Sequence, residues 1–161
     1  MAIYVQIGKK DEIKGNVTAA GHVNWIECGS FQFGVGRAIP MSTGKQTNRE
    51  ASLPSLSEIT LTKIMDDSSP YLFQEAVRGE SKPITIHVTK TGANQEELVV
   101  EYLLTAAMLS GYSVSTGGDA PSESFSVAYT KIEMKYFVWD EGHKKATQIP
   151  VFYDLAMVKG G

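Results

Sequence analysis

The stretch FSVAYTKIEMKYFVW, residues 125–139, decides the fold class. Its apolar side chains occupy odd positions as far as Tyr129 and even positions from Ile132 onward. Alternation with a period of two is typical of a half-buried strand, and the change of phase predicts a bulge or bend near Thr130–Lys131. Such a bend lets one long strand serve two sheets that meet at a corner. The stretch therefore predicts a β protein with two near-orthogonal sheets.

Alternating segments on the N-terminal and C-terminal sides of this stretch predict further strands. The segment 97–115 is expected to break near Gly111, and the polar segment 35–52 is expected to form a long loop, a feature that tends to be functional in compact domains. The chain has 161 residues, which suits a single domain over residues 1–161. We expect a mainly β fold, a β-barrel of two near-orthogonal antiparallel sheets with one short α-helix. The remaining predicted strands cover residues 2–8, 22–34, 54–64, 82–90 and 147–158.

One helix is predicted directly after the strand at 54–64. Ser69 suits the N-cap, Pro70 suits the first helical position, and Gly79 suits a left-handed C-terminal cap. So short a helix is not stable alone in water, and we expect its apolar stripe to pack on a sheet. The predicted stripe consists of Leu72, Phe73, Ala76 and Val77.

The composition argues against several classes of function. The formal net charge is −3, whereas a nucleic-acid partner requires a concentrated basic face. Cys28 is the single cysteine, so no disulfide forms within the chain and the fold does not depend on an oxidising compartment. Residues 1–12 lack the order of a cleavable signal, and no apolar segment is long enough to span a bilayer. We therefore expect a protein that folds in the cytoplasm without stable membrane insertion.

No local motif predicts catalysis, a cofactor or a metal site. The segment STGKQT, residues 42–47, departs from a phosphate-binding loop because Ile39 stands where the motif requires glycine and Gln46 where it requires Ser or Thr. His87 lies among threonines on a polar strand face and is expected to be solvated. An active site assembled from distant residues is an alternative that a single sequence leaves open. The histidines lack the spacing of metal ligands, and they are His22, His87 and His143.

Three segments in register resemble one protein family. They are WIECGSFQFG at 25–34, LTKIMDDSSPYL at 61–72 and SGYSVSTGGDAPSESFSVAYTKIEMKY at 110–136. Together they resemble the corresponding segments of the haemolysin-coregulated protein (Hcp) family, whose members are tube proteins of bacterial type VI secretion systems. The order and spacing of the segments agree with that family from the first strand to the last.

The resemblance implies a two-sheet barrel flanked by one helix, and hexameric rings that stack into the inner tube of the secretion machine. It implies that the tube is exported and that it carries and chaperones effector proteins in its lumen. It also implies contacts with sheath and spike components. The protein would be cytoplasmic before firing and then secreted without a signal peptide. No enzymatic activity and no cofactor are expected.

Two sets of residues are predicted to act in this assembly. The long loop resembles the family's extended loop between neighbouring rings, and the polar alternates of the strands are candidates for a wet lumen face. A lumen of mixed charge would let folded cargo bind weakly and leave. The ring-stacking candidates are Arg37, Met41, Lys45, Gln46 and Arg49. The lumen candidates are Gln32, Lys131, Glu133 and Lys135.

Three other interpretations compete with this one. A tail-tube subunit of a phage-like contractile particle would share the fold and the ring. A monomeric β-barrel that binds a small ligand would have an apolar pocket and would stay a monomer in solution. An enzyme of unrecognised type is the third. A measurement of particle size separates the ring-forming interpretations from the monomeric one.

Overall fold

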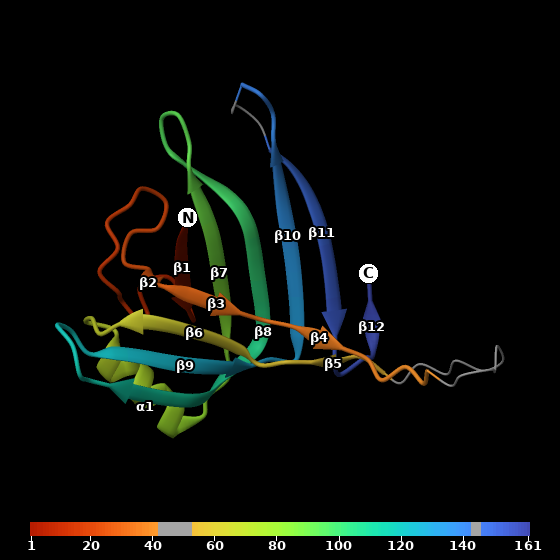
Figure 1. Cartoon of the computed structure of the whole chain (residues 1–161), viewed down its shortest axis with the longest axis horizontal. Helices are drawn as coiled ribbons and strands as arrows, with labels where there is room; N and C mark the ends of the chain where they lie inside the picture. Colours follow the sequence, from red (N-terminus) through yellow and green to blue (C-terminus); the bar gives the residue numbers. More distant parts are fainter. Residues whose placement is uncertain (42–52, 143–145) are drawn as a thin grey trace.

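The computed structural model describes residues 1–41, 53–142 and 146–161. Over these residues the fold is mainly β with one short helix, as predicted (Figure 1). The elements in chain order are β1 (Ala2–Ile7), β2 (Ile26–Cys28), β3 (Ser30–Gln32), β4 (Val35–Gly36), β5 (Ser55–Leu56), β6 (Ile59–Ile64), α1 (Ser69–Arg78), β7 (Lys82–Thr91), β8 (Glu96–Ser115), β9 (Ser122–Ala128), β10 (Lys131–Trp139), β11 (Ala146–Asp154) and β12 (Lys159–Gly160).

Ten of the strands form two sheets that share β8, and β4 pairs with β5 in a separate two-stranded ladder. The large sheet has the order β12-β11-β10-β8-β7-β1-β2, and the small sheet has the order β3-β6-β9-β8. The first half of β8 pairs with β7 and β10, and its second half pairs with β9. Figure 1 shows the small sheet running across the lower end of the large one, with α1 beneath it. In the described part of the chain the large sheet stays open, with β12 and β2 at its two ends.

The predicted change of phase marks the corner between the sheets. β9 ends at Ala128 in the small sheet, and β10 begins at Lys131 in the large sheet. The amide and hydroxyl of Thr130 both donate to the Thr105 carbonyl of β8, at 3.1 and 3.0 Å. At the same corner Ala106 has a φ of 49°, in the left-handed region that a non-glycine residue enters at a cost of roughly 1–2 kcal/mol. Both strands therefore turn together, and the prediction of a bend near Thr130–Lys131 is confirmed.

The core lies between the two sheets. From the large sheet Val5 and Ile86 are fully buried, and from the small sheet Leu61, Phe125 and Val127 are equally enclosed. Complete burial of one such side chain contributes about 1.5–3 kcal/mol. The alternate residues of each strand therefore fold the two sheets onto each other.

The helix begins one residue earlier than the sequence predicted. Ser68 is the N-cap, and its amide donates to the Asp66 carboxylate at 2.9 Å. A carboxylate is favourable there because the helix dipole is positive at this end. Gly79 closes the helix with a φ of 67°, and its amide donates to the Glu75 carbonyl at 3.0 Å. The predicted left-handed C-terminal cap is therefore confirmed.

The predicted apolar stripe of the helix is half wrong. Leu72 is completely buried and Ala76 is partly buried against the core, but Phe73 and Val77 keep 59% and 71% of their surface exposed. The helix turns a narrow line of residues towards β8, and an ion pair with β7 draws Glu75 into that line. The stripe predicted from spacing was too wide for a helix with one supporting face.

Candidate functional site

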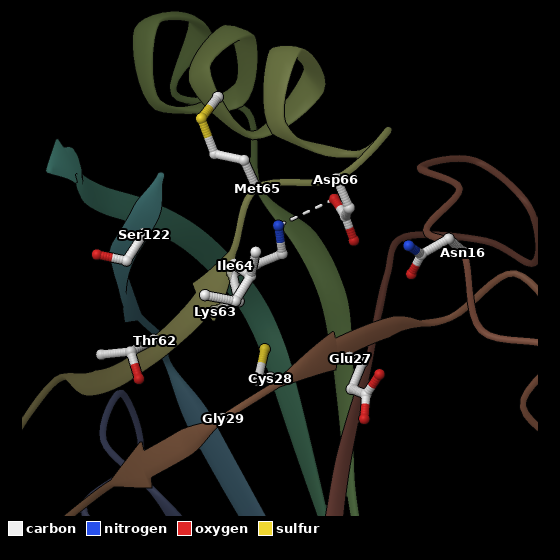
Figure 2. A pocket seen from close by; sticks show the side chains of 10 residues that line it. All are labelled: Asn16, Glu27, Cys28, Gly29, Thr62, Lys63, Ile64, Met65, Asp66 and Ser122. Atoms are coloured by element: carbon white, nitrogen blue, oxygen red, sulfur yellow. Dashed lines mark hydrogen bonds and ion pairs between the residues drawn. The ribbon is translucent and has the colours of Figure 1, made fainter. Parts of the chain in front are cut away.

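An open pocket of about 460 Å³ lies between β2, the end of β6 and the chain that enters α1. Figure 2 shows that charged and polar side chains from distant segments face this space. The residues that give it chemical character are Asn16, Glu27, Cys28, Lys63, Asp66 and Ser122.

The charged groups beside this pocket bind one another. The Lys63 ammonium is completely buried, and it contacts the Asp66 carboxylate at 2.9 Å and the buried Glu123 carboxylate. Glu123 also accepts hydrogen bonds from the hydroxyls of Ser69, at 2.8 Å, and Tyr112. Burial and the hydrogen bond to Glu123 raise the pKa of Tyr112 to about 12. A fully paired buried network rigidifies its surroundings, so this one fastens the start of α1 to the small sheet.

Cys28 adds no nucleophile to the pocket. Burial raises the pKa of its thiol to about 12, and only the thiolate is an effective nucleophile or metal ligand. The side chain packs in the core as a small apolar group. Among the described residues no cluster of His, Cys, Asp and Glu is arranged to hold a metal ion. The paired charges beside the pocket join the start of α1 to the small sheet.

The polar face of the large sheet brings together three of the four lumen candidates. Lys131, Glu133 and Lys135 alternate along β10, and Lys135 lies opposite Glu101 of β8. Its ammonium is 3.6 Å from the carboxylates of both Glu101 and Glu133. Glu101 in turn lies opposite His87 of β7 and contacts it at 2.6 Å. Sequence reasoning missed Glu101 and interpreted His87 as solvated, because their pairing depends on strand register.

The remaining predicted residues lie elsewhere. Gln32 is exposed in β3 of the small sheet, opposite Thr60 of β6, so it does not share a sheet with the other lumen candidates. Arg37 and Met41 are exposed after β4. The other ring-stacking candidates, Lys45, Gln46 and Arg49, lie outside the described residues.

The opposite face of the large sheet carries apolar residues that the small sheet does not cover. Tyr136 of β10 pairs with Ile149 of β11, and the two keep 47% and 52% of their surface exposed. Val138 and Val151 beside them are 46% exposed each. We call these four residues the β10–β11 patch. An apolar groove of about 240 Å³ continues the patch towards β4 and β5, where Val35 and Leu56 form its far wall.

A second apolar surface lies on the outer side of α1. Tyr71, Phe73 and Val77 are 52%, 59% and 71% exposed and line one shallow hollow. We call them the α1 patch. Figure 1 shows α1 below the small sheet at the lower left, and β10 and β11 on the right-hand side of the large sheet. The chain therefore presents two unlike apolar surfaces in different places.

Comparison with known families gives a clear assignment. The family model described as "Type VI secretion system effector, Hcp" matches residues 4–136. The chain belongs to the Hcp family. The resemblance inferred from the three sequence segments is therefore confirmed. None of the curated protein sequences matches the chain.

Solved structures agree with this assignment. A structure described as a type six secretion system protein is 25% identical, with a TM-score of 0.88 and coverage of 99% of both chains. Hcp1 from Salmonella typhimurium is 21% identical, with a TM-score of 0.77 over 99% of this chain and 98% of its own. A type VI secretion system effector from Yersinia pestis is 17% identical, with a TM-score of 0.71 over 94% of this chain and 98% of its own. The latter two establish a common fold. Within the described ranges, no helix has the length and apolar character needed to cross a bilayer.

Proposed function

We propose that this Hcp-family chain is a structural subunit of the type VI secretion inner tube. Copies form hexameric rings, the rings stack, and the tube is exported with effector proteins carried and chaperoned in its lumen. The protein acts by association and not by catalysis. The observation that carries the proposal is the β10–β11 patch, whose strands alternate like core strands but are not covered by the chain itself.

Two unlike patches favour a ring over a symmetric dimer. When one surface of a copy contacts a different surface of the next copy, each end of the assembly still has one surface free to bind a further copy. The same contact therefore repeats, and the assembly closes into a ring when the rotation from one copy to the next divides a full turn. The β10–β11 patch and the α1 patch are unlike surfaces on separate elements. Covering one half-exposed side chain of this size contributes about 1 kcal/mol, so the four residues of the β10–β11 patch supply a useful part of an interface.

The polar face of the large sheet suits the lumen. Lys131, Glu133, Lys135 and Glu101 alternate in sign across β10 and β8. These ion pairs are partly exposed, and pairs in contact with solvent contribute only about 0–1 kcal/mol each, so cargo can exchange with them at little cost. Gln32 lies in β3 of the small sheet, and it remains a lumen candidate only because it is a polar alternate of its strand. Arg37 and Met41, together with Lys45, Gln46 and Arg49, remain candidates for contacts between stacked rings.

The proposal extends to partners and location. Sheath and spike components of the secretion apparatus would bind the assembled tube, and effector proteins would occupy its lumen. The chain would be cytoplasmic before firing and then secreted through the type VI apparatus. Its net charge of −3 gives no support for a nucleic-acid partner.

Sedimentation and electron microscopy test the proposal. The protein is expected to sediment as a ring and to show annular particles. Ile149→Glu places a charge in the β10–β11 patch and is expected to convert rings to monomers. Gln148 is the residue next to Ile149 in β11; it is also exposed and faces the other side of the sheet. Gln148→Glu therefore adds the same charge outside the β10–β11 patch and is expected to leave more rings intact than Ile149→Glu. A wild-type protein that stays monomeric at every concentration would overturn the proposal and would favour a monomeric ligand-binding protein.

A further inference from the structure

Two histidines from distant parts of the chain share a hydrogen bond on the polar face of the large sheet. His22 belongs to the connection between β1 and β2, and its Nε2 lies 2.8 Å from Nδ1 of His87 in β7. The other ring nitrogen of His87 lies 2.6 Å from the Glu101 carboxylate of β8. His22, His87 and Glu101 therefore form one continuous hydrogen-bonded chain.

Aromatic rings enclose His22. The Tyr4 ring stacks on it with 4.5 Å between centroids, and the Trp25 ring meets it edge-on at 4.9 Å. Trp25 also lies 4.7 Å from the His87 ring. Only 9% of His22 is exposed, and its Nδ1 is buried without a hydrogen-bond partner in the described chain. A second ring proton on His22 is favoured by the Glu96 carboxylate and the Ala20 backbone, but burial and the neighbouring His87 oppose it more strongly.

The hydrogen bond admits at most one charged ring. A bond between two imidazoles needs a proton on one nitrogen and a lone pair on the other. If His87 is neutral and its Nε2 donates to Glu101, then His22 donates to His87. If His87 is charged, a neutral His22 accepts from it. When both rings are charged, two N–H groups point at each other across 2.8 Å, and the bond is lost.

The surroundings of His22 favour its neutral form in the closed turn. Burial lowers the pKa of His22 and the neighbouring His87 lowers it further, while the Glu96 carboxylate and the Ala20 backbone act in the opposite direction. Glu96 is already engaged, because it accepts a hydrogen bond from the Tyr4 hydroxyl at 2.8 Å. The titratable groups around the pair are Tyr4 on β1, Glu27 on β2, His87 on β7, Glu96 and Glu101 on β8, and Glu133 and Lys135 on β10.

The turn that carries His22 is suited to local opening. Residues 19–25 contain two positive φ angles, 84° at Gly21 and 67° at Asn24. Below the turn, Ile13 and Val17 are buried and hold the stem of the connection in the core. Backbone hydrogen bonds join Gly15 to Asn24, and Val17 to both Asn24 and Trp25, so the turn stays attached to this stem if its side chains leave the sheet.

We propose that the His22–His87 pair is an acid-opened latch that holds residues 19–25 on the polar face of the large sheet. Above the ordinary histidine pKa of about 6.5 the pair is closed with at most one charge. Below it, the open turn takes up a proton that the closed pair excludes. Acid therefore releases His22 and Trp25 and uncovers Tyr4 and His87.

The pH range follows from proton linkage. A histidine whose folded pKa is lowered stabilises the closed form fully above its unfolded pKa, and this stability declines below that value until the pH has fallen through the lowered folded pKa. Half a pH unit below about 6.5, opening becomes up to about fourfold more favourable. The latch lies within one chain and operates whether or not rings form. Only one consequence rests on the proposed function, namely that opening adds positive charge to the lumen wall.

Fluorescence and NMR on the full chain test the latch. Trp139→Phe leaves Trp25 as the single tryptophan, since the chain has two, and Trp25 emission is followed between about pH 8 and pH 5. A reversible transition centred below about 6.5 is expected. His22→Gln is expected to abolish it, and His143→Gln, which replaces a histidine outside the described residues, is expected to retain it. The same transition in all variants would overturn the proposal.

Two further readouts keep the test decisive if a variant folds poorly. In the wild-type chain, the His22 ring signals are expected to titrate below those of an unfolded reference peptide. The Trp25 amide, which donates to the His22 carbonyl at 3.0 Å, is expected to exchange with solvent up to about fourfold more readily half a pH unit below 6.5, after correction for intrinsic rates. Titration of His22 at the ordinary value with unchanged Trp25 exchange would also refute the latch. Sedimentation of each sample separates this result from any failure of ring formation.

Discussion

Two parts of one alternating stretch have opposite surroundings. Phe125 and Val127 in β9 are 1% and 0% exposed beneath the large sheet. Tyr136 and Val138 in β10 are 47% and 46% exposed, although the period of two resumes after the bend with its phase shifted by one residue. The difference shows that apolar alternation predicts which face of a strand becomes buried. It does not predict whether that face is buried by another part of the same chain, which depends on the tertiary structure. We propose that a neighbouring copy supplies it for β10 and β11.

The largest expected effect lies in the covered part. Phe125→Ala is expected to lower the free energy of unfolding by about 4 kcal/mol, because it removes a large side chain from the core and leaves a cavity. Chemical denaturation of the isolated protomer measures the change. Tyr136→Ala is the matched control in the uncovered part, and its cost is expected to stay below about 1 kcal/mol. Equal costs for the two variants would break the comparison.

A slightly smaller effect is expected at the joint between α1 and the small sheet. Lys63→Met leaves the carboxylates of Asp66 and Glu123 without their buried cation, and this is expected to cost about 3 kcal/mol of unfolding free energy. Lys159→Met, at an exposed lysine of β12, is expected to change stability by less than about 0.5 kcal/mol. Thermal and denaturant unfolding of both variants provide the measurement. Indistinguishable stabilities would show that the buried network contributes little.

The smallest effect concerns the corner that separates the two parts. Ala106→Gly relieves a positive φ of 49° and is expected to stabilise the protein by about 0.5 kcal/mol, since glycine adopts this conformation without strain. Ala107→Gly next to it is expected to destabilise the protein by about 1 kcal/mol. The buried methyl group of Ala107 is lost, and glycine gives the unfolded chain more conformational entropy to lose on folding. Denaturation midpoints compare the two, and a change of the same sign in both would contradict the assigned strain.

Several features of the fold were predictable from local pattern. The bend near Thr130–Lys131 followed from a change of phase, because neighbouring strand residues must face opposite sides. The cap at Gly79 followed from the residue type, because glycine readily adopts the left-handed conformation. The family followed from three segments in register, and the match over residues 4–136 confirms it. Phe73 and Val77 were wrongly predicted to pack on the sheet. The spacing of apolar residues gives the width of the stripe on the helix, but it does not say how much of the stripe contacts the sheet.

The candidate sites were less accessible to sequence reasoning. Lys131, Glu133 and Lys135 share a face, as their alternation required. Their neighbour Glu101 depends on the register between β8 and β10, and a sequence does not state that register. The contact between His22 and His87 joins positions 65 residues apart, and no local sequence motif predicts it. The ring-stacking and lumen roles stay predictions, which the assembly experiments address.

The sequence by itself determined that this chain is mainly β, where its long alternating stretch bends, where its helix ends and to which family it belongs. These features depend on neighbouring residues or on short segments in fixed order. The tertiary structure alone decided that Lys63 meets Glu123, that His22 meets His87 and that the far ends of β10 and β11 lie uncovered. Each of these depends on which distant strands pair and in what register, and that outcome is set by the burial of the whole core and not by any single segment.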